Sequence, residues 1–357
     1  MTETTPEPAL LCDAVELACR APSLHNSQPW RWVAKGSTLH LYADLSRVVT
    51  AADPQGREIY LSCGAALDHM VVAMAAEGWD TDVHRFPDPH EPLHVAAIQF
   101  RPALQPVTDE CRARAEAIRV RRTDRRAFDA PSDRVSLEVL LRQTVIPYHV
   151  MCDVVLDHAR PRLAEASRLT EAIRHNDPSY EAELAWWSSS VVPHAGLAYS
   201  TQPSAAESDR VDVARRFPAT RQRSVDDNRG NDRSMIMVLS TSDEDARHDV
   251  LRCGEALSAV LLEATMAGQA TCTLTHMTEL AQSRELIRRL TGQRGLPQLL
   301  IRFGEAPPEG DIAATPRRPL SRSAGVPRLG HCAVAAEPAV GRERSGFGSK
   351  DRRGGAQ

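Results

Sequence analysis

The sequence repeats itself at two places far apart in the chain. Residues 61–79 (LSCGAALDHMVVAMAAEGW) align without gaps with residues 251–269 (LRCGEALSAVLLEATMAGQ). The matching positions are Leu61, Cys63, Gly64, Ala66, Leu67 and Gly78 in the first copy and Leu251, Cys253, Gly254, Ala256, Leu257 and Gly268 in the second. Each copy is mostly apolar with little polar face, which is typical of a long helix buried on several sides. A chain with two such helices must supply other elements to cover both.

Two interpretations of the repeat are open. Any two buried helices can share leucine, alanine and glycine by composition alone. The alternative is duplication of an α+β unit, in which the two long helices pack against each other as the centre of a pseudo-dimer. The glycine near the start of each helix permits the close backbone approach that such packing needs.

Hydrophobic periodicity places further elements around both helices. The expected helices cover residues 10–20, 58–77, 109–122, 133–143, 161–175, 179–190 and 246–267. The expected strands are 30–33 and 39–42, joined as a hairpin, then 93–100, 150–156, 234–241 and 297–303. These elements predict the α+β class, with a first half at 10–105 and a second half at 106–320 behind a flexible N-terminus at 1–9.

Two segments show no such pattern. Residues 191–230 are rich in Ser, Pro, Asp and Arg, so we expect a long, lid-like loop. Loops of this length in compact domains are usually functional covers or disordered. In residues 321–357 glycine, arginine and small residues dominate, and we expect a disordered tail.

Composition excludes several classes of protein. The net charge of −4 is not that of a nucleic-acid or anionic-membrane binder, which would carry a basic surplus. No segment reaches about 18 uninterrupted apolar residues, and residues 1–9 do not form a basic and apolar leader. The eight cysteines are scattered without a CxxC pair, which favours reduced thiols in a cytoplasmic protein. Lys35 and Lys350 are the only lysines, so arginine is the residue available for anion binding.

Two segments combine a constrained backbone with polar side chains. Residues 21–30 (APSLHNSQPW) hold Ser, Asn and Gln between two prolines, which suits the edge of a flat heterocycle with alternating N–H and C=O groups. A helix end followed by a strand would explain the same residues. Residues 121–128 (RRTDRRAF) hold four arginines and a hydroxyl, the groups that a terminal phosphate needs. A solvated helix face paired with Asp124 and Asp129 is the alternative.

Later segments carry weaker signals. Arg317 and Arg318 stand between two prolines that hold them extended, although a tail would look similar. Residues 270–276 (ATCTLTH) follow the second long helix and are expected to form a polar turn that offers a backbone N–H to a ligand. His84, His90 and His94 lie in a proline-rich stretch that lacks carboxylate support, so no metal site is expected.

Together these segments resemble the nitroreductase-like flavoprotein family. Pro-Ser-x-x-Asn-x-Gln-Pro-Trp at 22–30, Arg-Arg-Thr-x-Arg at 121–125, the long helix ending in glycine and the late arginine pair are most similar to its Acg-type subfamily. In that subfamily two nitroreductase units are fused in one chain. The likeness covers about residues 10–320. It implies a nitroreductase-like fold, built as an intramolecular pseudo-dimer and expected to be monomeric.

The resemblance also implies an FMN site made by both halves. Pro22, Ser23 and Asn26 would touch the ring or ribityl chain with Gln28 in support; Arg121, Thr123 and Arg125 would hold ribityl and phosphate; Arg317 and Arg318 would complete the phosphate pocket. Thr275 and His276 stand where many members have a Glu-Gly pair that donates a backbone N–H to the flavin N5. The first half lacks an arginine segment, and an unlike stretch near 180–187 takes the place of the second half's loop, so one site is expected.

Two functions follow from the resemblance. The first is an FMN-dependent NAD(P)H oxidoreductase for nitro-compounds, quinones or similar acceptors, in which no side chain need act as a catalytic acid or base. The second is an FMN-binding or FMN-sequestering stress or dormancy protein with little turnover. In that case residues 191–230 would cover the flavin and prevent the near-contact that hydride transfer from a nicotinamide requires.

Overall fold

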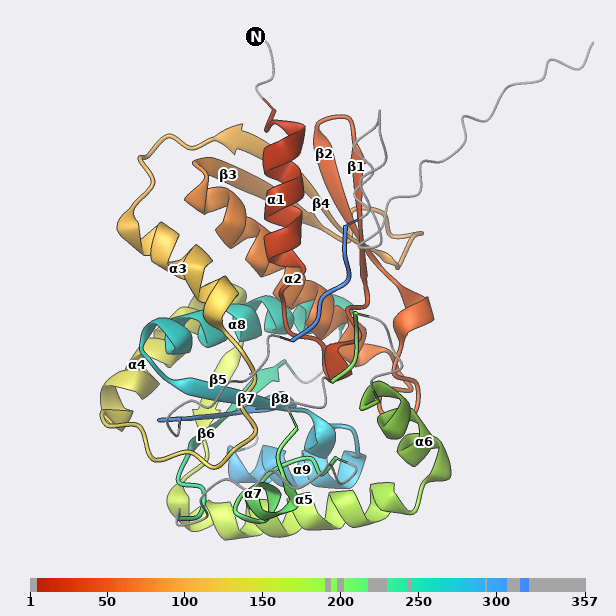
Figure 1. The fold of residues 1–357 in the computed structure, drawn as a ribbon, viewed down its shortest axis with the longest axis vertical. Coiled ribbons are helices and arrows are strands. Elements are labelled where there is room, and N and C mark those ends of the chain that lie inside the picture. The colour runs from red at the N-terminus through yellow and green to blue at the C-terminus, as the bar shows by residue number, and fades with distance from the viewer. Residues whose placement is uncertain are drawn as a thin grey trace, which may run out of the picture.

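Two four-stranded antiparallel sheets, one from each half of the chain, frame the molecule in this computed structural model (Figure 1). The described residues are 5–189, 194–197, 202–217, 230–242, 246–292, 294–306 and 315–320. The first sheet contains β1 (Trp30–Lys35), β2 (Thr38–Ala43), β4 (His94–Pro102) and β3 (Trp79–Arg85), in that order. The second contains β5 (Met151–Val154), β6 (Met235–Thr241), β8 (Leu296–Gly304) and β7 (Ala270–Leu274). The α+β prediction is confirmed.

The two sheets share one strand plan. In each, the second and third strands along the chain are joined by a long helix, and the fourth strand inserts between them. The second strand carries a register shift in both sheets, at Leu41/Tyr42 in β2 and at Leu239/Ser240 in β6. The halves therefore repeat in topology as well as in sequence.

The two repeated segments form the long helices α2 (Arg57–Ala76) and α8 (Arg247–Met266), which lie between the sheets (Figure 1). They pack against each other where their glycines meet: a Cβ built on Gly64 would lie 2.9 Å from the Cα of Gly254. By length and composition α2 could cross a membrane, but 78% of its most apolar stretch is buried inside the protein. Its apolar character is explained by this central position.

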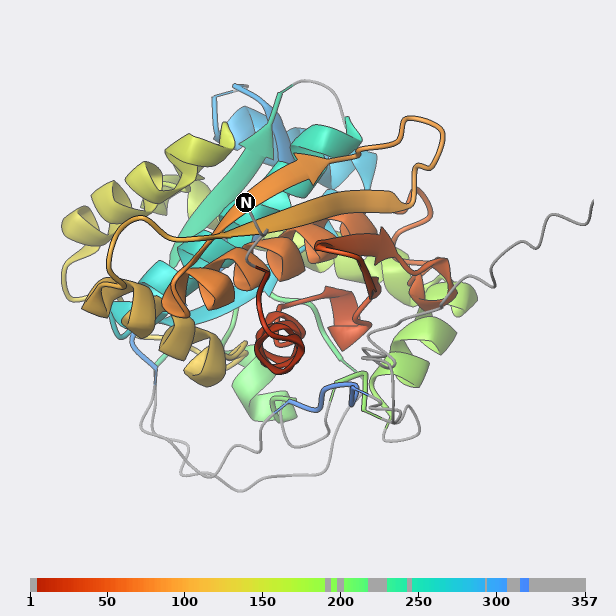
Figure 2. The same cartoon turned by 90° about the horizontal axis from the view of Figure 1, so that it is seen from above.

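Seven other helices surround this core in the described part of the chain. They are α1 (Pro8–Ala18), α3 (Asp109–Val120), α4 (Arg134–Val145), α5 (Arg160–His175), α6 (Pro178–Trp187), α7 (Ala205–Asp209) and α9 (Ala281–Leu290). Local chemistry sets their starts, because proline occupies the first turn of α1, α5 and α6, and side chains of Thr108 and Asp133 cap α3 and α4. In the view from above these helices lie around α2 and α8 (Figure 2).

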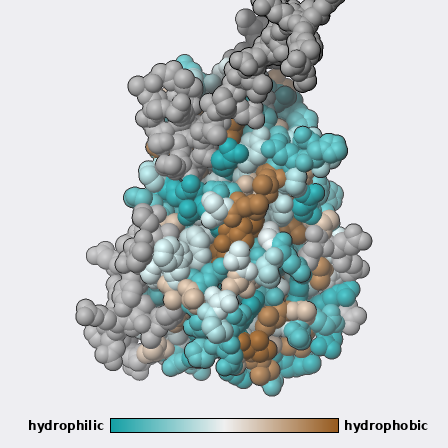
Figure 3. Space-filling view, turned by 90° about the vertical axis from the view of Figure 1, so that its right-hand side faces the viewer, coloured by the Kyte–Doolittle hydropathy of each residue, from teal (hydrophilic) through white to brown (hydrophobic). Residues whose placement is uncertain are grey.

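The second sheet is buried on both faces. Met235, Met237 and Leu239 of β6 pack toward α4 and α8, whereas Ile236 and Val238 pack in a second cluster with α5 and α9. A strand covered on both sides reads as a continuous apolar run, which is why SMIMVLST gave a clear strand signal. The described residues on the face shown in Figure 3 are mostly hydrophilic, with an apolar band across the middle and an apolar patch below it.

Several elements differ from the sequence-based expectation. β3, which contains His84, was not expected, because this edge strand is partly exposed and its charged side chains hide the alternation. Residues 270–274, expected to belong to a polar turn, form edge strand β7. α9 was also missed, since only Ser283 and Ile287 of it are buried. Within the expected 191–230 loop, α7 is helical.

Other expectations fall outside the described residues. These are the N-terminal residues 1–4, parts of the 191–230 segment (191–193, 198–201 and 218–229) and the tail at 321–357. Seven of the cysteines lie in the described part of the chain, and none of these seven forms a disulfide.

The counterpart of the first half's polar loop is not where the sequence placed it. β1 and β5 hold the same position in their sheets, and β5 is reached from α4 through residues 146–150. This connection, and not the stretch near 180–187, replaces the loop in the second half. Tyr148 within it donates a hydrogen bond to Asp68 on α2 (2.9 Å). Residues 178–187 instead form α6, whose Glu183 accepts hydrogen bonds from the backbone at 51–52.

Candidate functional site

A cavity of about 260 Å³ lies where the two halves meet. The first half supplies the loop at 22–25 and the start of α2. The second half supplies residues of α5, β7 and the arginine segment, and residues 203–217 form a further wall. Both polar and apolar side chains line the space, as in ligand sites that bury a flat molecule and orient it by a few polar contacts.

The loop at 22–28 adopts an unusual backbone. His25, Asn26 and Gln28 all have positive φ values, of 49°, 54° and 53°. Residues other than glycine avoid this left-handed region, and each such residue costs of the order of 1–2 kcal/mol. Such a conformation persists only where surrounding contacts enforce it, and at ligand sites it fixes the direction of backbone and side-chain groups.

The side chains of Asn26 and Gln28 hold this loop by binding other segments of the chain. Asn26 Nδ2 donates to the carbonyls of Gly196 and Pro316, both at 3.0 Å, and its Oδ1 accepts from Arg317 at 3.2 Å. Gln28 Nε2 donates to the carbonyl of His194 (2.9 Å), and its Oε1 accepts from the backbone N–H of Arg318 (3.0 Å). The loop from the front of the chain and the late arginine pair therefore meet directly.

The arginine segment is extended and runs beside edge strand β7. Thr123 forms a parallel bridge with Thr271, and the backbone N–H of Asp124 donates to the carbonyl of Thr271 (2.9 Å). Because side chains alternate along extended backbone, Thr123 and Arg125 face the cavity. The Asp124 carboxylate pairs with Arg126 at 2.5 Å, away from this row.

Arg121 begins the same row and lies in a cationic cluster with Arg20 and Arg317. Burial, followed by the charges of these arginines, lowers the pKa of the neighbouring His69 well below its usual range, so His69 is neutral. Nη2 of Arg121 and Nη2 of Arg317 both donate to the carbonyl of Arg20, at 3.3 and 2.9 Å. Arg121 is 7% exposed, and its Nε and Nη1 have no hydrogen-bond partner. Burial, and secondarily the charge of Arg20, lowers the pKa of Arg121 to about 10. Among the described residues no carboxylate pairs with Arg20 or Arg121, so the cluster can accept an anion.

Thr275 ends the wall made by β7 and is tied to a buried ionic network. Arg215 donates to Thr275 Oγ1 at 3.2 Å and forms a close ion pair with Glu279. Arg174 pairs with the same carboxylate at 3.3 Å. These contacts fix the end of β7 and the segment that carries Arg215 relative to each other.

Residues 203–217 bring aromatic and cationic groups against the polar loop. The rings of Phe217 and His25 meet edge to face with centroids 6.3 Å apart, and the guanidinium of Arg125 lies 5.1 Å from the centre of the Phe217 ring. Burial, followed by the charges of Arg215 and Arg125, lowers the pKa of His25 well below its usual range. His25 is therefore neutral at physiological pH and can lie against an uncharged ring.

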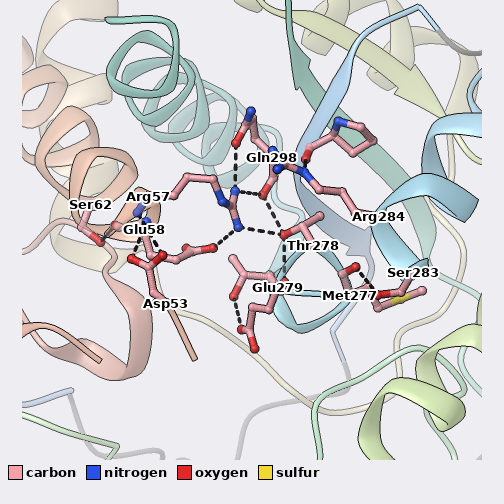
Figure 4. A network of polar contacts seen from close by, with 12 residues as sticks. Asp53, Arg57, Glu58, Ser62, Met277, Thr278, Glu279, Ser283, Arg284 and Gln298 are labelled. Carbon is pink, nitrogen blue, oxygen red and sulfur yellow. Dashed lines mark hydrogen bonds and ion pairs between the residues drawn. The ribbon is translucent and has the colours of Figure 1, made fainter. Parts of the chain in front are cut away.

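Sequence reasoning missed Glu58, which lines the cavity at the start of α2. Its Oε1 accepts from Arg57 Nη2 at 2.6 Å, and Arg57 is itself held by Gln298 and Thr278 (Figure 4). Burial raises the pKa of Glu58 to about 8. In the sequence, Glu58 resembles any polar residue in the first turn of an amphipathic helix. It is unusual only because its partner Arg57 binds Gln298, which lies 241 residues away in the chain.

The predicted site residues fall into three groups. Pro22, Ser23, Thr123, Arg125 and Thr275 line the cavity. Asn26, Gln28, Arg317 and Arg318 connect the loop to the 315–318 segment. Arg121 lies in the cationic cluster, which adds Arg20 to the residues that the sequence indicated, with the neutral His69 beside it.

Comparison with known proteins gives strong sequence matches. A protein of Mycobacterium tuberculosis (strain ATCC 25618 / H37Rv), named "Putative NAD(P)H nitroreductase acg", is 52% identical over 321 residues, which cover 90% of this chain and 96% of that protein. A second protein of this strain, whose name also describes an NAD(P)H nitroreductase, is 37% identical over 335 residues, covering 89% and 91%. No protein-family model matches the chain. The structure of the FMN-dependent nitroreductase NfnB from Mycobacterium smegmatis in complex with NADPH is 15% identical, covers 61% of this chain and 99% of that one, and has a TM-score of 0.36.

Proposed function

Because the chain belongs to the Acg-type nitroreductase family, we propose that it is an FMN-dependent NAD(P)H oxidoreductase acting on nitro-compounds, quinones or similar acceptors. The observation that carries the proposal is the cationic cluster beside the cavity. Two buried nitrogens of Arg121 lack partners, and no carboxylate balances Arg121 or Arg20 among the described residues. A phosphate monoester supplies both the missing acceptors and the missing charge. The donor set therefore fits the phosphate end of FMN.

In this proposal each group of site residues has one task. Arg121, assisted by Arg20 and Arg317, holds the phosphate, and Thr123 and Arg125 hold the ribityl chain and ring. Pro22, Ser23 and Thr275 border the ring in the cavity, where backbone N–H groups can donate to its heteroatoms. Bound FMN would supply two-electron exchange with NAD(P)H and with the acceptor. The protein supplies orientation and exclusion of water.

We propose one FMN per chain. When the ungapped alignment of the repeat is continued past residues 79 and 269, Arg85 stands opposite Thr275. Arg85 forms a two-bonded ion pair with Glu255 on α8 (2.6 and 2.9 Å). The Tyr148–Asp68 hydrogen bond belongs to the 146–150 connection, which replaces the polar loop in the second half. These side chains support closure of the counterpart site. Residues from both halves of one chain line the cavity, which supports a monomer as the binding unit.

The absorbance spectrum of the purified protein and titration of the cofactor-free protein with FMN test this proposal. We expect a flavin spectrum, a stoichiometry of one FMN per chain and bleaching of the flavin by NADPH without oxygen. A colourless protein that ignores added FMN would contradict the proposed cofactor.

A second function, FMN binding with little turnover, is favoured by one observation. Phe217, Arg215 and Val211 come from the segment that forms a wall of the same cavity. A fixed wall there would keep a nicotinamide from stacking on the flavin, since hydride transfer needs a separation of roughly 3–3.5 Å. Stopped-flow reduction separates the two functions: rapid bleaching by NADPH supports the enzyme, and bleaching by dithionite alone supports the binding protein.

A further inference from the structure

We propose that Glu58 donates a proton to the electron acceptor in the cavity, an inference that rests on the proposed oxidoreductase function. Glu58 is the second residue of α2, and it lines the cavity together with Ser62, Thr275 and Arg215. It is 4% exposed, so it is largely shielded from bulk water.

The position of Glu58 is fixed by its neighbours (Figure 4). The carboxylate of Asp53 accepts the backbone N–H groups of Arg57 (2.9 Å) and Glu58 (2.8 Å), which sets the first turn of α2. Arg57 Nη1 donates to the carbonyl oxygen and to Oε1 of Gln298, at 2.7 and 2.8 Å. The same guanidinium donates through Nη2 to Glu58 Oε1 at 2.6 Å. Among the described residues Arg57 is the only donor to the Glu58 carboxyl group, which leaves Oε2 for a molecule in the cavity.

The surroundings of Glu58 favour its protonated form near neutral pH. Burial is the largest effect on its pKa, which lies at about 8. Arg57 on α2 and Arg215 on the 203–217 wall lower this pKa, whereas Asp53 before α2 and Glu279 near the end of β7 raise it. An acid with a pKa near the working pH is suited to proton transfer.

The chemistry balances with Glu58 as the source of one proton. Reduction of a quinone to a hydroquinone consumes two electrons and two protons. Bound reduced FMN would supply both electrons and one of the protons as a hydride, so the second oxygen of the acceptor needs one proton more. In this step the O–H bond at Glu58 Oε2 breaks, its electron pair stays on the carboxylate, and the proton forms an O–H bond on the acceptor. Arg57 stabilises the carboxylate, which regains a proton from water.

Glu58→Gln tests the proposal because glutamine keeps an acceptor for Arg57 but has no proton to transfer. In the parent, we expect reoxidation of the reduced flavin by a quinone to slow above about pH 8. In Glu58→Gln this step should be slower by roughly 10²-fold or more and independent of pH over the same range. Reduction by NADPH should change by less than about threefold, since it needs no proton from Glu58.

A matched variant and a readout without turnover complete the experiment. Glu171→Gln removes a different cavity carboxyl and should retain the alkaline fall in quinone reduction. Burial raises the pKa of Glu171 to about 7, so its protonated carboxyl also contributes an infrared C=O stretch at pH 6. The part of this band that belongs to Glu58 should disappear in Glu58→Gln and remain in Glu171→Gln. An unchanged pH profile in Glu58→Gln, or a parent in which Glu58 is ionised at pH 6, would overturn the role of Glu58. Loss of FMN binding or of flavin reduction in the parent would instead contradict the proposed function.

Discussion

Gly64 on α2 and Gly254 on α8 stand opposite each other where the two helices cross. A Cβ on Gly64 would lie 2.1 Å from the carbonyl oxygen of Leu251, and a Cβ on Gly254 would lie 2.1 Å from the carbonyl oxygen of Leu61. The four residues are two pairs of matching positions in the sequence repeat. The contact is thus reciprocal, as expected when a symmetric dimer interface becomes internal to one chain.

Gly64→Ala and Gly254→Ala should each destabilise the protein strongly. Backbone atoms form the obstacle, so relief requires the helices to move apart, and we expect a loss of at least about 3 kcal/mol in the free energy of unfolding. Urea unfolding of each variant measures this loss. Gly230→Ala, whose added Cβ would meet nothing within 4 Å, is the control and should change stability by less than about 0.5 kcal/mol. A similar small effect at Gly64 would contradict the close crossing.

The central helices could be predicted from sequence because their signal is local. Both are long, apolar and end at a glycine with positive φ, Gly78 (78°) and Gly268 (73°). The edge strands β3 and β7 could not be predicted in this way, because their hydrogen bonds come from partner strands elsewhere in the sequence. In addition, β3 is partly exposed to solvent. Threonine, aspartate and arginine are also common in loops, so these strands look like loops until their partner strands are known.

Arg121→Met should affect the cofactor-free protein and the complex in opposite directions. Methionine removes a buried charge with unpartnered nitrogens, so the free energy of unfolding without FMN should rise by about 1–3 kcal/mol. FMN affinity should fall by roughly tenfold to a hundredfold, the loss of one charged hydrogen-bonding contact. Thermal unfolding and FMN titration measure the two effects.

Riboflavin and a neighbouring arginine provide the controls for Arg121. Riboflavin lacks the phosphate, so its affinity should be nearly the same in the parent and in Arg121→Met. Arg119→Ala, which removes a largely exposed side chain paired with Glu116, should leave FMN affinity within about threefold. Equal losses of FMN and riboflavin affinity would show that Arg121 does not hold the phosphate.

Substitutions at Asn26 should separate backbone strain from hydrogen bonding in the loop. Asn26→Gly loses the contacts to Gly196, Pro316 and Arg317 but tolerates the φ of 54°. Asn26→Ala loses the same contacts and adds a strained backbone, so it should be about 1 kcal/mol less stable than Asn26→Gly. Chemical denaturation of both variants measures the difference. Equal stabilities would mean that the left-handed conformation is not maintained.

The candidate site was only partly accessible from sequence. The arginines and the hydroxyl of residues 121–128 indicated a phosphate site, but the extended row of Arg121, Thr123 and Arg125 was not expected, because it depends on the bridge between Thr123 and Thr271, 148 residues later in the chain. Asn26 and Gln28 were recognised as polar loop residues, but their partners lie at 194–196 and 316–318, which no local pattern specifies. Glu58 depends on Gln298 and Thr278 through Arg57, so its environment exists only in the folded chain.

Protein stability should depend on the ionisation of Glu58. Its pKa is raised from 4.5 to about 8 in the folded protein, so the folded state binds more protons than the unfolded state between these values. The stabilisation is complete below about pH 4.5 and is lost as the pH rises to about 8, with a total of the order of 4–5 kcal/mol. Glu58→Gln should therefore match the parent near pH 5 and be more stable at pH 9. Unfolding measured across this range would refute the assignment if the parent stayed the more stable protein at pH 9.

Phe217→Ala should reveal whether the 203–217 wall limits access to the cavity. The Phe217 ring contacts His25 edge to face, and the guanidinium of Arg125 lies over the face of the same ring. Removal of the ring therefore opens the wall beside the polar loop. We expect NADPH to reduce the bound flavin at least about tenfold faster in Phe217→Ala than in the parent, measured by stopped-flow absorbance. Phe217→Leu, which keeps apolar bulk at the same place, should stay close to the parent rate. If Phe217→Ala and the parent are reduced equally fast, access is not limited by this side chain, and the binding-protein alternative loses the observation that favours it.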